Sequence, residues 1–153
     1  MSNYKKCIVC NTDAQVLMTD IILNKHTVKY YLCPLCKCIF TETPYWINEA
    51  YTDSIASIDT GIMSRNISVC NSLITIFEMY FDANIKVADY GGGYGILTRM
   101  LRDKGIDAYW HDKYSLNLLS KGFEFDTQSK VDVIVAIEVI EHLQNPIETI
   151  KEI

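Results

Sequence analysis

The feature that most constrains the fold is a turn with glycine at every second position, set between a short apolar strand and an amphipathic helix. The turn runs from Asp89 to Gly95, follows the apolar pair Val87 and Ala88, and leads into Ile96–Leu101. Glycine is placed in this way where the backbone adopts positive φ or where a ligand lies directly against it. The order strand, glycine turn, helix therefore predicts a cofactor site in an α/β domain.

The glycine spacing differs from the dinucleotide fingerprint. A G-x-G-x-x-G pattern that begins at Gly91 requires glycine where Ile96 stands. The chain instead has G-x-G-x-G at Gly91, Gly93 and Gly95, with Asp89 two residues before the first glycine. A glycine-rich turn in some other doubly wound α/β protein stays the alternative interpretation.

Two later segments extend the pattern. Residues 105–112 indicate a helix-ending glycine and a strand with Asp112 at its tip, roughly twenty residues after the glycine loop, where an acid meets ribose hydroxyls in this architecture. Residues 131–143 form an apolar strand that continues as E-V-x-E-H from Glu138. In this order, the three segments resemble the motifs of class I S-adenosylmethionine-dependent methyltransferases.

The resemblance implies S-adenosylmethionine as cofactor. The glycine loop is expected to pass under its methionyl and ribose parts, Asp89 to support its amino-acid head, and Asp112 to accept from both ribose hydroxyls. For Asp89 the alternative is a carboxylate that caps the N–H groups of its own turn, and for Arg65 it is a surface side chain. The remaining expected cofactor contacts are Arg65 toward the carboxylate, Ile137 and Glu138 after the fourth strand, and Phe123 and Glu124 toward adenine.

Methyl transfer from a sulfonium is a direct displacement, so alignment and exclusion of water contribute most of the catalysis. A hydroxyl acceptor also needs a general base, and Glu141 and His142 are the expected catalytic residues. A packing or hydrogen-bonding role is the alternative for His142.

Two C-x-x-C pairs predict a zinc ribbon between Cys7 and about Phe40. Both thiolates of such a knuckle point to one side of a tight turn, so two knuckles supply four sulfurs in tetrahedral geometry. Incidental cysteines are the alternative, and Cys38 is either a packed thiol or a replacement ligand for Cys36. Cys70 fits a helix core. The expected zinc ligands are Cys7, Cys10, Cys33 and Cys36.

The alternation of strands and helices predicts a Rossmann-like, doubly wound parallel sheet covered on both faces. The expected domains are a zinc ribbon at 1–42 and an incomplete methyltransferase domain at 43–153. The other expected elements are helices at 43–51, 63–81, 116–121 and from Asn145 to Ile153, and an abbreviated strand at 122–125. On the second helix, the expected apolar face carries Ile67, Cys70, Ile74, Phe77 and Phe81.

The composition of the chain limits the classes of partner that we expect. The net charge of −5 disfavours nucleic acid, no apolar run is long enough for a membrane span, and no signal peptide is recognised, which predicts a cytoplasmic protein. Over nearly its whole length the chain resembles bacterial-type methyltransferases that carry an amino-terminal zinc segment and act on sugars or surface glycans. This resemblance implies a small-molecule or glycan acceptor.

The 153-residue sequence reaches only the helix after the expected fourth strand, whereas a class I sheet has seven strands. We therefore expect a fragment of a longer product, or an open sheet edge covered by a homodimer or partner chain. A non-catalytic module that binds S-adenosylmethionine or docks a partner is the alternative function. A nicotinamide-dependent reductase is a weaker third possibility, because the G-x-G-x-G spacing speaks against it.

Overall fold

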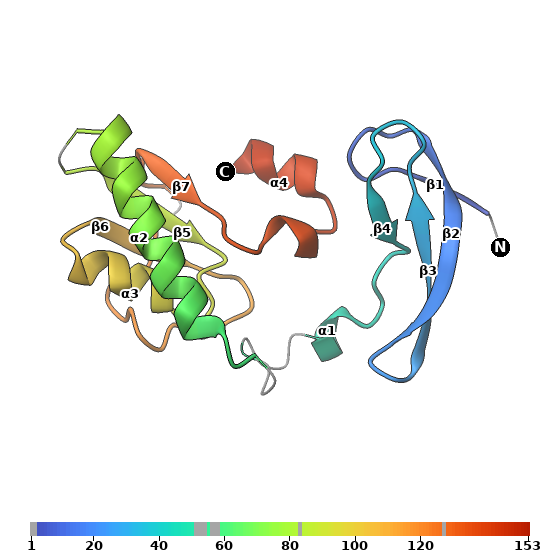
Figure 1. Ribbon diagram of the computed structural model, residues 1–153, viewed down its shortest axis with the longest axis horizontal. Helices are drawn as coiled ribbons and strands as arrows, with labels where there is room; N and C mark the ends of the chain where they lie inside the picture. Colours follow the sequence, from blue (N-terminus) through green and yellow to red (C-terminus); the bar gives the residue numbers. More distant parts are fainter. Residues whose placement is uncertain (1–2, 51–54, 56–58, 83, 127) are drawn as a thin grey trace. The chain divides into compact units, whose positions relative to one another are not determined.

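The structure, a computed structural model, describes residues 3–50, 55, 59–82, 84–126 and 128–153. The chain forms two compact units, which are described separately below. One comprises Met1–Thr52 with Glu141–Ile153, and the other comprises Asp53–Ile140. Figure 1 shows the order of the elements along the chain.

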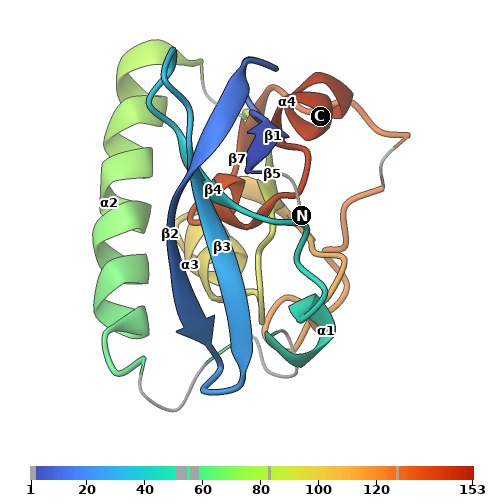
Figure 2. The same ribbon diagram turned by 90° about the vertical axis from the view of Figure 1, so that its right-hand side faces the viewer.

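The first unit contains an antiparallel sheet in the order β1-β2-β3-β4. Its long central strands, β2 and β3, are visible as a twisted hairpin in Figure 2. The four strands are β1 (Tyr4–Lys6), β2 (Asp13–Ile22), β3 (His26–Leu32) and β4 (Ile39–Thr41). The unit also contains the short helices α1 (Ile47–Ala50) and α4 (Pro146–Glu152), and the chain passes from one unit to the other within the 3-10 turn η1 (Ile140–His142).

The core of this sheet is small and consists partly of cysteine. Cys7 and Cys33 are buried with Ala14, Tyr31 and Phe40, and the Tyr31 and Phe40 rings stack with centroids 5.7 Å apart. So few apolar side chains stabilise a sheet only weakly, and small domains of this kind usually rely on a metal or disulfides.

The second unit is built on a parallel sheet in the order β6-β5-β7. Its strands are β5 (Lys86–Tyr90), β6 (Asp107–His111) and β7 (Val133–Val135), and its helices are α2 (Ile62–Tyr80) and α3 (Ile96–Asp103). In register, Asp89 of β5 lies opposite Trp110 of β6 and Val135 of β7. This confirms the predicted parallel sheet at the glycine loop.

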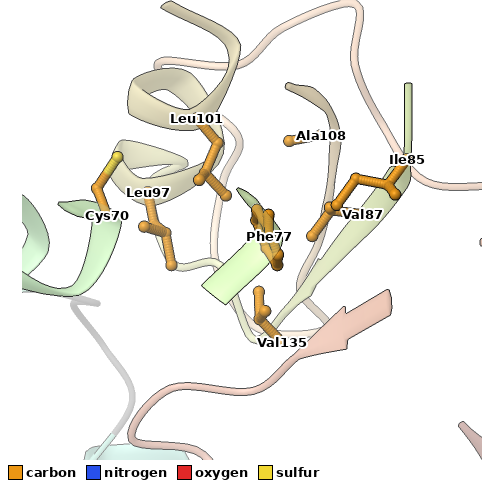
Figure 3. Close-up of a cluster of buried hydrophobic side chains, with 8 residues drawn as sticks. All are labelled: Cys70, Phe77, Ile85, Val87, Leu97, Leu101, Ala108 and Val135. Carbon is orange, nitrogen blue, oxygen red and sulfur yellow. The ribbon is translucent and has the colours of Figure 1, made fainter. Parts of the chain in front are cut away.

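Figure 3 shows the buried cluster that joins α2 and α3 to the sheet. Both helices contribute to the same cluster, so they cover the same face of the sheet, whereas the sequence predicts cover on both faces. The members are Cys70 and Phe77 from α2, Leu97 and Leu101 from α3, and Ile85, Val87, Ala108 and Val135 from the sheet and its approach.

The predicted helix at 116–121 is wrong. That segment is an irregular loop, because the Asn117 side chain donates to the Ser120 carbonyl and accepts from the Ser120 N–H, and such local bonds compete with a helix. The predicted strand at 122–125 is reduced to one bridge between Glu124 and Trp110.

Two helix predictions need adjustment. The helix predicted at 43–51 begins only at Ile47, and residue 51 lies outside the described residues. Ile67 of α2 is 48% exposed and Phe81, which follows the helix, is 40% exposed, so the buried face of α2 is centred on Cys70 and Phe77 instead. Among the described residues, no helix has the length and apolar character needed to cross a membrane.

Candidate functional site

The glycine loop follows β5 and is fixed to the end of β6 by backbone bonds. The N–H groups of Gly91 and Gly92 donate to the His111 carbonyl at 2.7 and 3.1 Å. The indole N–H of Trp110 donates to the Gly93 carbonyl at 2.9 Å. The loop therefore has one defined path at the carboxyl end of the sheet, where doubly wound folds bind their ligands.

The glycines of this loop meet different requirements. At Gly91, where φ is +75°, an added Cβ would lie 2.5 Å from Val139 Cγ2. At Gly95, where φ is +87°, it would lie 3.0 Å from Ser120 Oγ, whose hydroxyl donates to the Gly95 carbonyl. At Gly93, where φ is +55°, it would meet nothing within 4 Å. Gly93 is therefore the point at which the loop backbone is open to a ligand.

Asp112, at the end of β6, lies against this open point. Its Oδ2 accepts from the Gly93 N–H at 2.9 Å, and its Oδ1 accepts from the N–H groups of Tyr114 and Ser115 at 2.7 and 2.8 Å. A carboxylate offers about four acceptor positions, so three are occupied. One position remains for a hydroxyl, whereas the expected bidentate contact with two ribose hydroxyls requires two.

Asp89 is buried behind the loop and is bonded within the fold. It is 2% exposed, and its Oδ2 accepts from the Thr98 hydroxyl at 2.7 Å and from the Thr98 N–H at 3.2 Å. Burial raises the pKa of Asp89 to about 6, the bonds from Thr98 oppose this rise, and the charge of Asp112 adds to it. The carboxylate thus fixes the first turn of α3 to the glycine loop.

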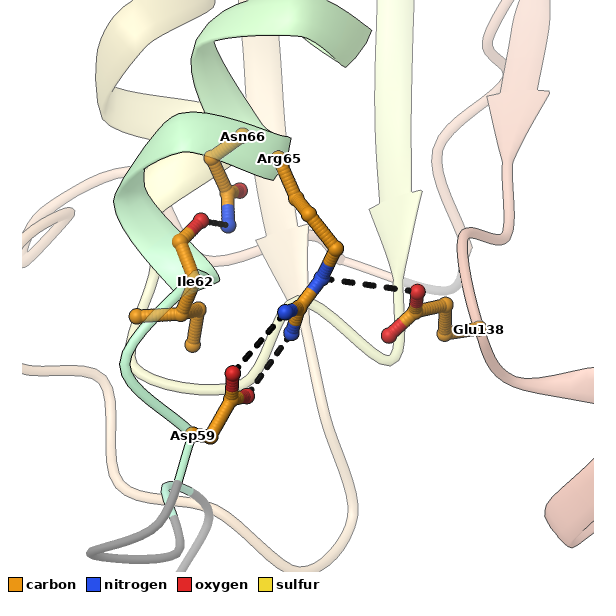
Figure 4. A network of polar contacts seen from close by, with 5 residues as sticks. All are labelled: Asp59, Ile62, Arg65, Asn66 and Glu138. Carbon is orange, nitrogen blue, oxygen red and sulfur yellow. Dashed lines mark hydrogen bonds and ion pairs between the residues drawn. The ribbon is translucent and has the colours of Figure 1, made fainter.

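Arg65 links two segments at the same edge of the sheet, as Figure 4 shows. Its guanidinium donates to both carboxylate oxygens of Asp59, at 2.8 and 2.7 Å, and its Nε lies 3.6 Å from Glu138 Oε1. The hydrogen bonds from Arg65 lower the pKa of Asp59. Glu138 has a φ of +54°, a conformation that costs energy in a residue other than glycine. The segment after β7 is therefore held in a strained path.

The other predicted site residues are less closely tied to the loop. Ile137 is 40% exposed next to Glu138. Glu141 and His142 are exposed in η1 and belong to the first unit, so their catalytic role stays a prediction. At the expected adenine contacts, one face of the Phe123 ring is covered by the Arg102 guanidinium, 3.6 Å from the ring centroid.

Four residues of the site were not found by sequence reasoning. They are Thr98, Trp110, Ser120 and Val139, and each contacts a glycine or aspartate of the loop from a different element. The available sequence signal for Thr98 was its position on the apolar face of the expected helix. A polar side chain at such a position needs a hydrogen-bond partner.

The four predicted metal ligands are brought together in the first unit. The sulfur atoms of Cys7, Cys10, Cys33 and Cys36 all lie within 4.8 Å of one another. Cys7 Sγ is 3.5 Å from Cys36 Sγ, and Cys10 Sγ is 3.4 Å from Cys33 Sγ. Tetrahedral zinc with bonds of about 2.3 Å holds its sulfurs about 3.8 Å apart, so the cluster has the size of a zinc site.

The two knuckles have the same backbone. The N–H of Asn11 donates to the Cys7 carbonyl at 3.0 Å, and the N–H of Lys37 donates to the Cys33 carbonyl at 3.1 Å. Both donors have positive φ, 59° for Asn11 and 64° for Lys37. Cys38 falls after the second knuckle and packs beside the small core, so the cluster contains Cys36 and not Cys38.

The crowded thiols shift the pKa values of two cysteines in opposite directions. The Thr12 side chain lowers the pKa of Cys10 to about 6. The Cys38 backbone favours the Cys36 thiolate, but loss of hydration and the neighbouring thiols outweigh it and raise the pKa of Cys36 to about 12. Four thiolates cannot ionise together in this space without a cation. The donor set therefore fits a soft divalent metal.

Comparison with known proteins identifies the family. A methyltransferase domain family matches residues 63–153, which is more than half of the chain. The match includes α2, the glycine loop, Asp112 and the segment after β7, and it excludes the cysteine cluster. The chain belongs to this methyltransferase family, for which S-adenosylmethionine is the typical methyl donor. No curated protein matches the chain.

Proposed function

We propose that this chain binds S-adenosylmethionine at the glycine loop and transfers its methyl group to a small-molecule or glycan acceptor. The observation that carries the proposal is the open backbone at Gly93 beside the Asp112 carboxylate, in a chain of the methyltransferase family. The bound cofactor supplies an electrophilic methyl group on its sulfonium.

The residues of the site divide between contact and support. Asp112 has acceptor capacity left for a ribose hydroxyl, and Gly93 lets the cofactor lie against the backbone. Asp89 supports the cofactor through Thr98 and the position of α3, because its own carboxylate is buried. Arg65, together with Ile137 and Glu138, completes the proposed site at the end of β7.

For the acceptor, we propose Glu141 and His142 as the residues that remove a proton when the methylated atom is a hydroxyl oxygen. An acidic chain of net charge −5 suits a small or glycan acceptor better than a nucleic acid. A cytoplasmic location is part of the same proposal.

We also propose that zinc is bound by the four clustered cysteines and supplies much of the folding free energy of the ribbon at 1–42. The methyltransferase domain then occupies 43–153. Among the described residues, β7 pairs with β5 alone, which supports a second copy or partner chain at its other side.

Methyl transfer from labelled S-adenosylmethionine to fractionated small molecules and glycans of a bacterial cell tests the proposal. We expect label in one acceptor fraction with the wild-type chain and at least tenfold less with Asp112→Ala. Asp126→Ala is the matched control, because Asp126 caps its own loop at Gln128 without contacting the glycine loop. Cofactor binding with no transfer to any fraction would favour the non-catalytic module.

A further inference from the structure

An exposed apolar loop lies beside the proposed cofactor site. The loop follows Asp112 and spans residues 113–121, and its outward side chains include Leu116, which is 73% exposed. Soluble chains seldom display several large apolar side chains in so short a segment unless that surface binds something. The exposed apolar residues are Tyr114 at 62%, Leu116 at 73%, Leu118 at 49% and Leu119 at 48%.

The charges around these side chains favour an anionic partner. Lys113 and Lys121 bracket the loop and are exposed, whereas the flanking carboxylates of Asp112 and Glu124 accept hydrogen bonds from Ser115 and Asn117 within the loop. The Lys113 ammonium lies 5.5 Å from the Tyr114 ring centroid. Leucine and tyrosine beside two exposed ammonium groups form a surface of the kind that meets anionic lipid headgroups.

The backbone of the loop is suited to a medium with little water, because many of its N–H groups are already bonded. Those of Tyr114 and Ser115 donate to Asp112, and those of Leu118 and Leu119 donate to the Tyr94 carbonyl at 3.3 and 3.0 Å. Unsatisfied backbone donors are costly in an apolar environment. These bonds reduce the cost of moving the loop from water into the less polar part of a headgroup layer.

The strand order separates this loop from the unpaired side of β7. The loop follows β6, whereas β7 lies on the opposite side of β5. A strand that extends the sheet beyond β7 would therefore join at the edge away from β6, so completion of the sheet does not explain the exposed leucines.

We propose that residues 113–121 form a membrane-contact loop that binds anionic lipid surfaces. If the methyltransferase function proposed above is correct, this contact places the cofactor site at a lipid surface and favours acceptors presented there. The lipid contact itself does not depend on that function.

Flotation of the full chain with vesicles of equimolar phosphatidylcholine and phosphatidylglycerol tests the proposal. We expect the wild type to float with these vesicles, and more weakly with phosphatidylcholine alone or at high salt. The variant Leu116→Ser/Leu119→Ser should bind about tenfold or more weakly. The matched control is Met79→Ser/Tyr80→Ser, two exposed residues of α2, and it should bind as the wild type does.

A second variant, Lys113→Gln/Lys121→Gln, should lose the preference for phosphatidylglycerol while its thermal unfolding is unchanged. Absence of wild-type binding, or equal binding by the leucine variant, would overturn the proposal. A leucine variant that changes only the oligomeric state would assign the loop to a second copy instead. Titration with S-adenosylmethionine without lipid reports separately on the proposed function.

Discussion

At the scale of single residues, Gly91 and Gly93 have different roles: Gly91 is required by close packing, and Gly93 leaves space for a ligand. Both have positive φ, but a methyl group at Gly91 would collide with Val139, whereas one at Gly93 would enter open space. Alanine at either position carries the cost of a left-handed conformation, about 1 to 2 kcal/mol. The collision at Gly91 adds a further overpacking cost of about 1 to 3 kcal/mol.

Gly91→Ala should therefore lower the free energy of unfolding more than Gly93→Ala does, as measured by urea denaturation. Val139→Ala should restore part of the loss in the double variant, because it removes the atom that collides. Gly93→Ala should fold and yet bind S-adenosylmethionine at least tenfold more weakly. Equal stability of the two single variants would contradict the contact with Val139.

The burial of Asp89 predicts a pH dependence of stability. Its folded pKa of about 6 lies above the unfolded value of about 3.9, so the folded state binds the proton more tightly. Its contribution to stability is therefore complete below about pH 4 and is lost as the pH rises through 6. Relative to Asp89→Asn, the wild type should lose about 2 to 3 kcal/mol between pH 4 and 7.

Urea denaturation of both proteins across this pH range gives the combined effect of Asp89 and its interaction with Asp112, since the more distant carboxylates contribute equally to both. The asparagine side chain of the variant retains a carbonyl oxygen that can accept from Thr98. A difference in unfolding free energy that does not vary with pH would show that Asp89 is not a buried acid of raised pKa.

At the scale of elements, the corrected face of α2 can be tested with two phenylalanines of the same helix end. Phe77 is 4% exposed within the core, and Phe81 is 40% exposed. Phe77→Ala should cost about 3 to 5 kcal/mol of unfolding free energy because it leaves a cavity. Phe81→Ala should cost less than half as much, whereas equal costs would restore the face predicted from the sequence, which contains both residues.

The cysteine cluster can be tested with a matched pair of variants in the same way. Cys36→Ser removes a sulfur of the cluster, whereas Cys38→Ser changes a thiol outside it. Zinc measured by elemental mass spectrometry should be bound near one ion per chain in Cys38→Ser and largely lost in Cys36→Ser. Zinc loss in Cys38→Ser with retention in Cys36→Ser would exchange the two roles.

Sequence patterns predicted the elements whose side chains repeat regularly. The parallel strands and α3 followed from the apolar runs and the glycine turn, and the cluster of four cysteines followed from two C-x-x-C pairs. The irregular loop at 113–121 was not predicted, because Leu116, Leu118 and Leu119 suit a helix. Hydrogen bonds that Asn117 donates and Asp112 accepts hold the backbone in another conformation. Such bonds depend on which segments meet in space.

The candidate site was predictable to a similar degree. The glycine positions and Asp112 are fixed by local motifs, so they were found. Thr98 and Val139 belong to the site because they contact residues of other elements. The periodicity of a sequence does not predict contacts of this kind. The burial of Asp89 likewise depends on the packing of α3 against β5, which no local motif records.

At the scale of the whole molecule, a cysteine-rich sheet and an α/β unit have separate cores. The methyltransferase family match covers the α/β unit with the C-terminal segment that follows it, and leaves the cysteine sheet as an additional part of the chain. The proposed function requires above all that the loop between β5 and α3 binds S-adenosylmethionine with the help of Asp112.

Isothermal titration of the full chain with S-adenosylmethionine is the most direct test of that claim. We expect saturable binding of one equivalent, at least tenfold weaker in Asp112→Ala, unchanged in Asp126→Ala, and no comparable binding of NAD. Binding of NAD without S-adenosylmethionine, or equal affinity in Asp112→Ala and the wild type, would contradict it.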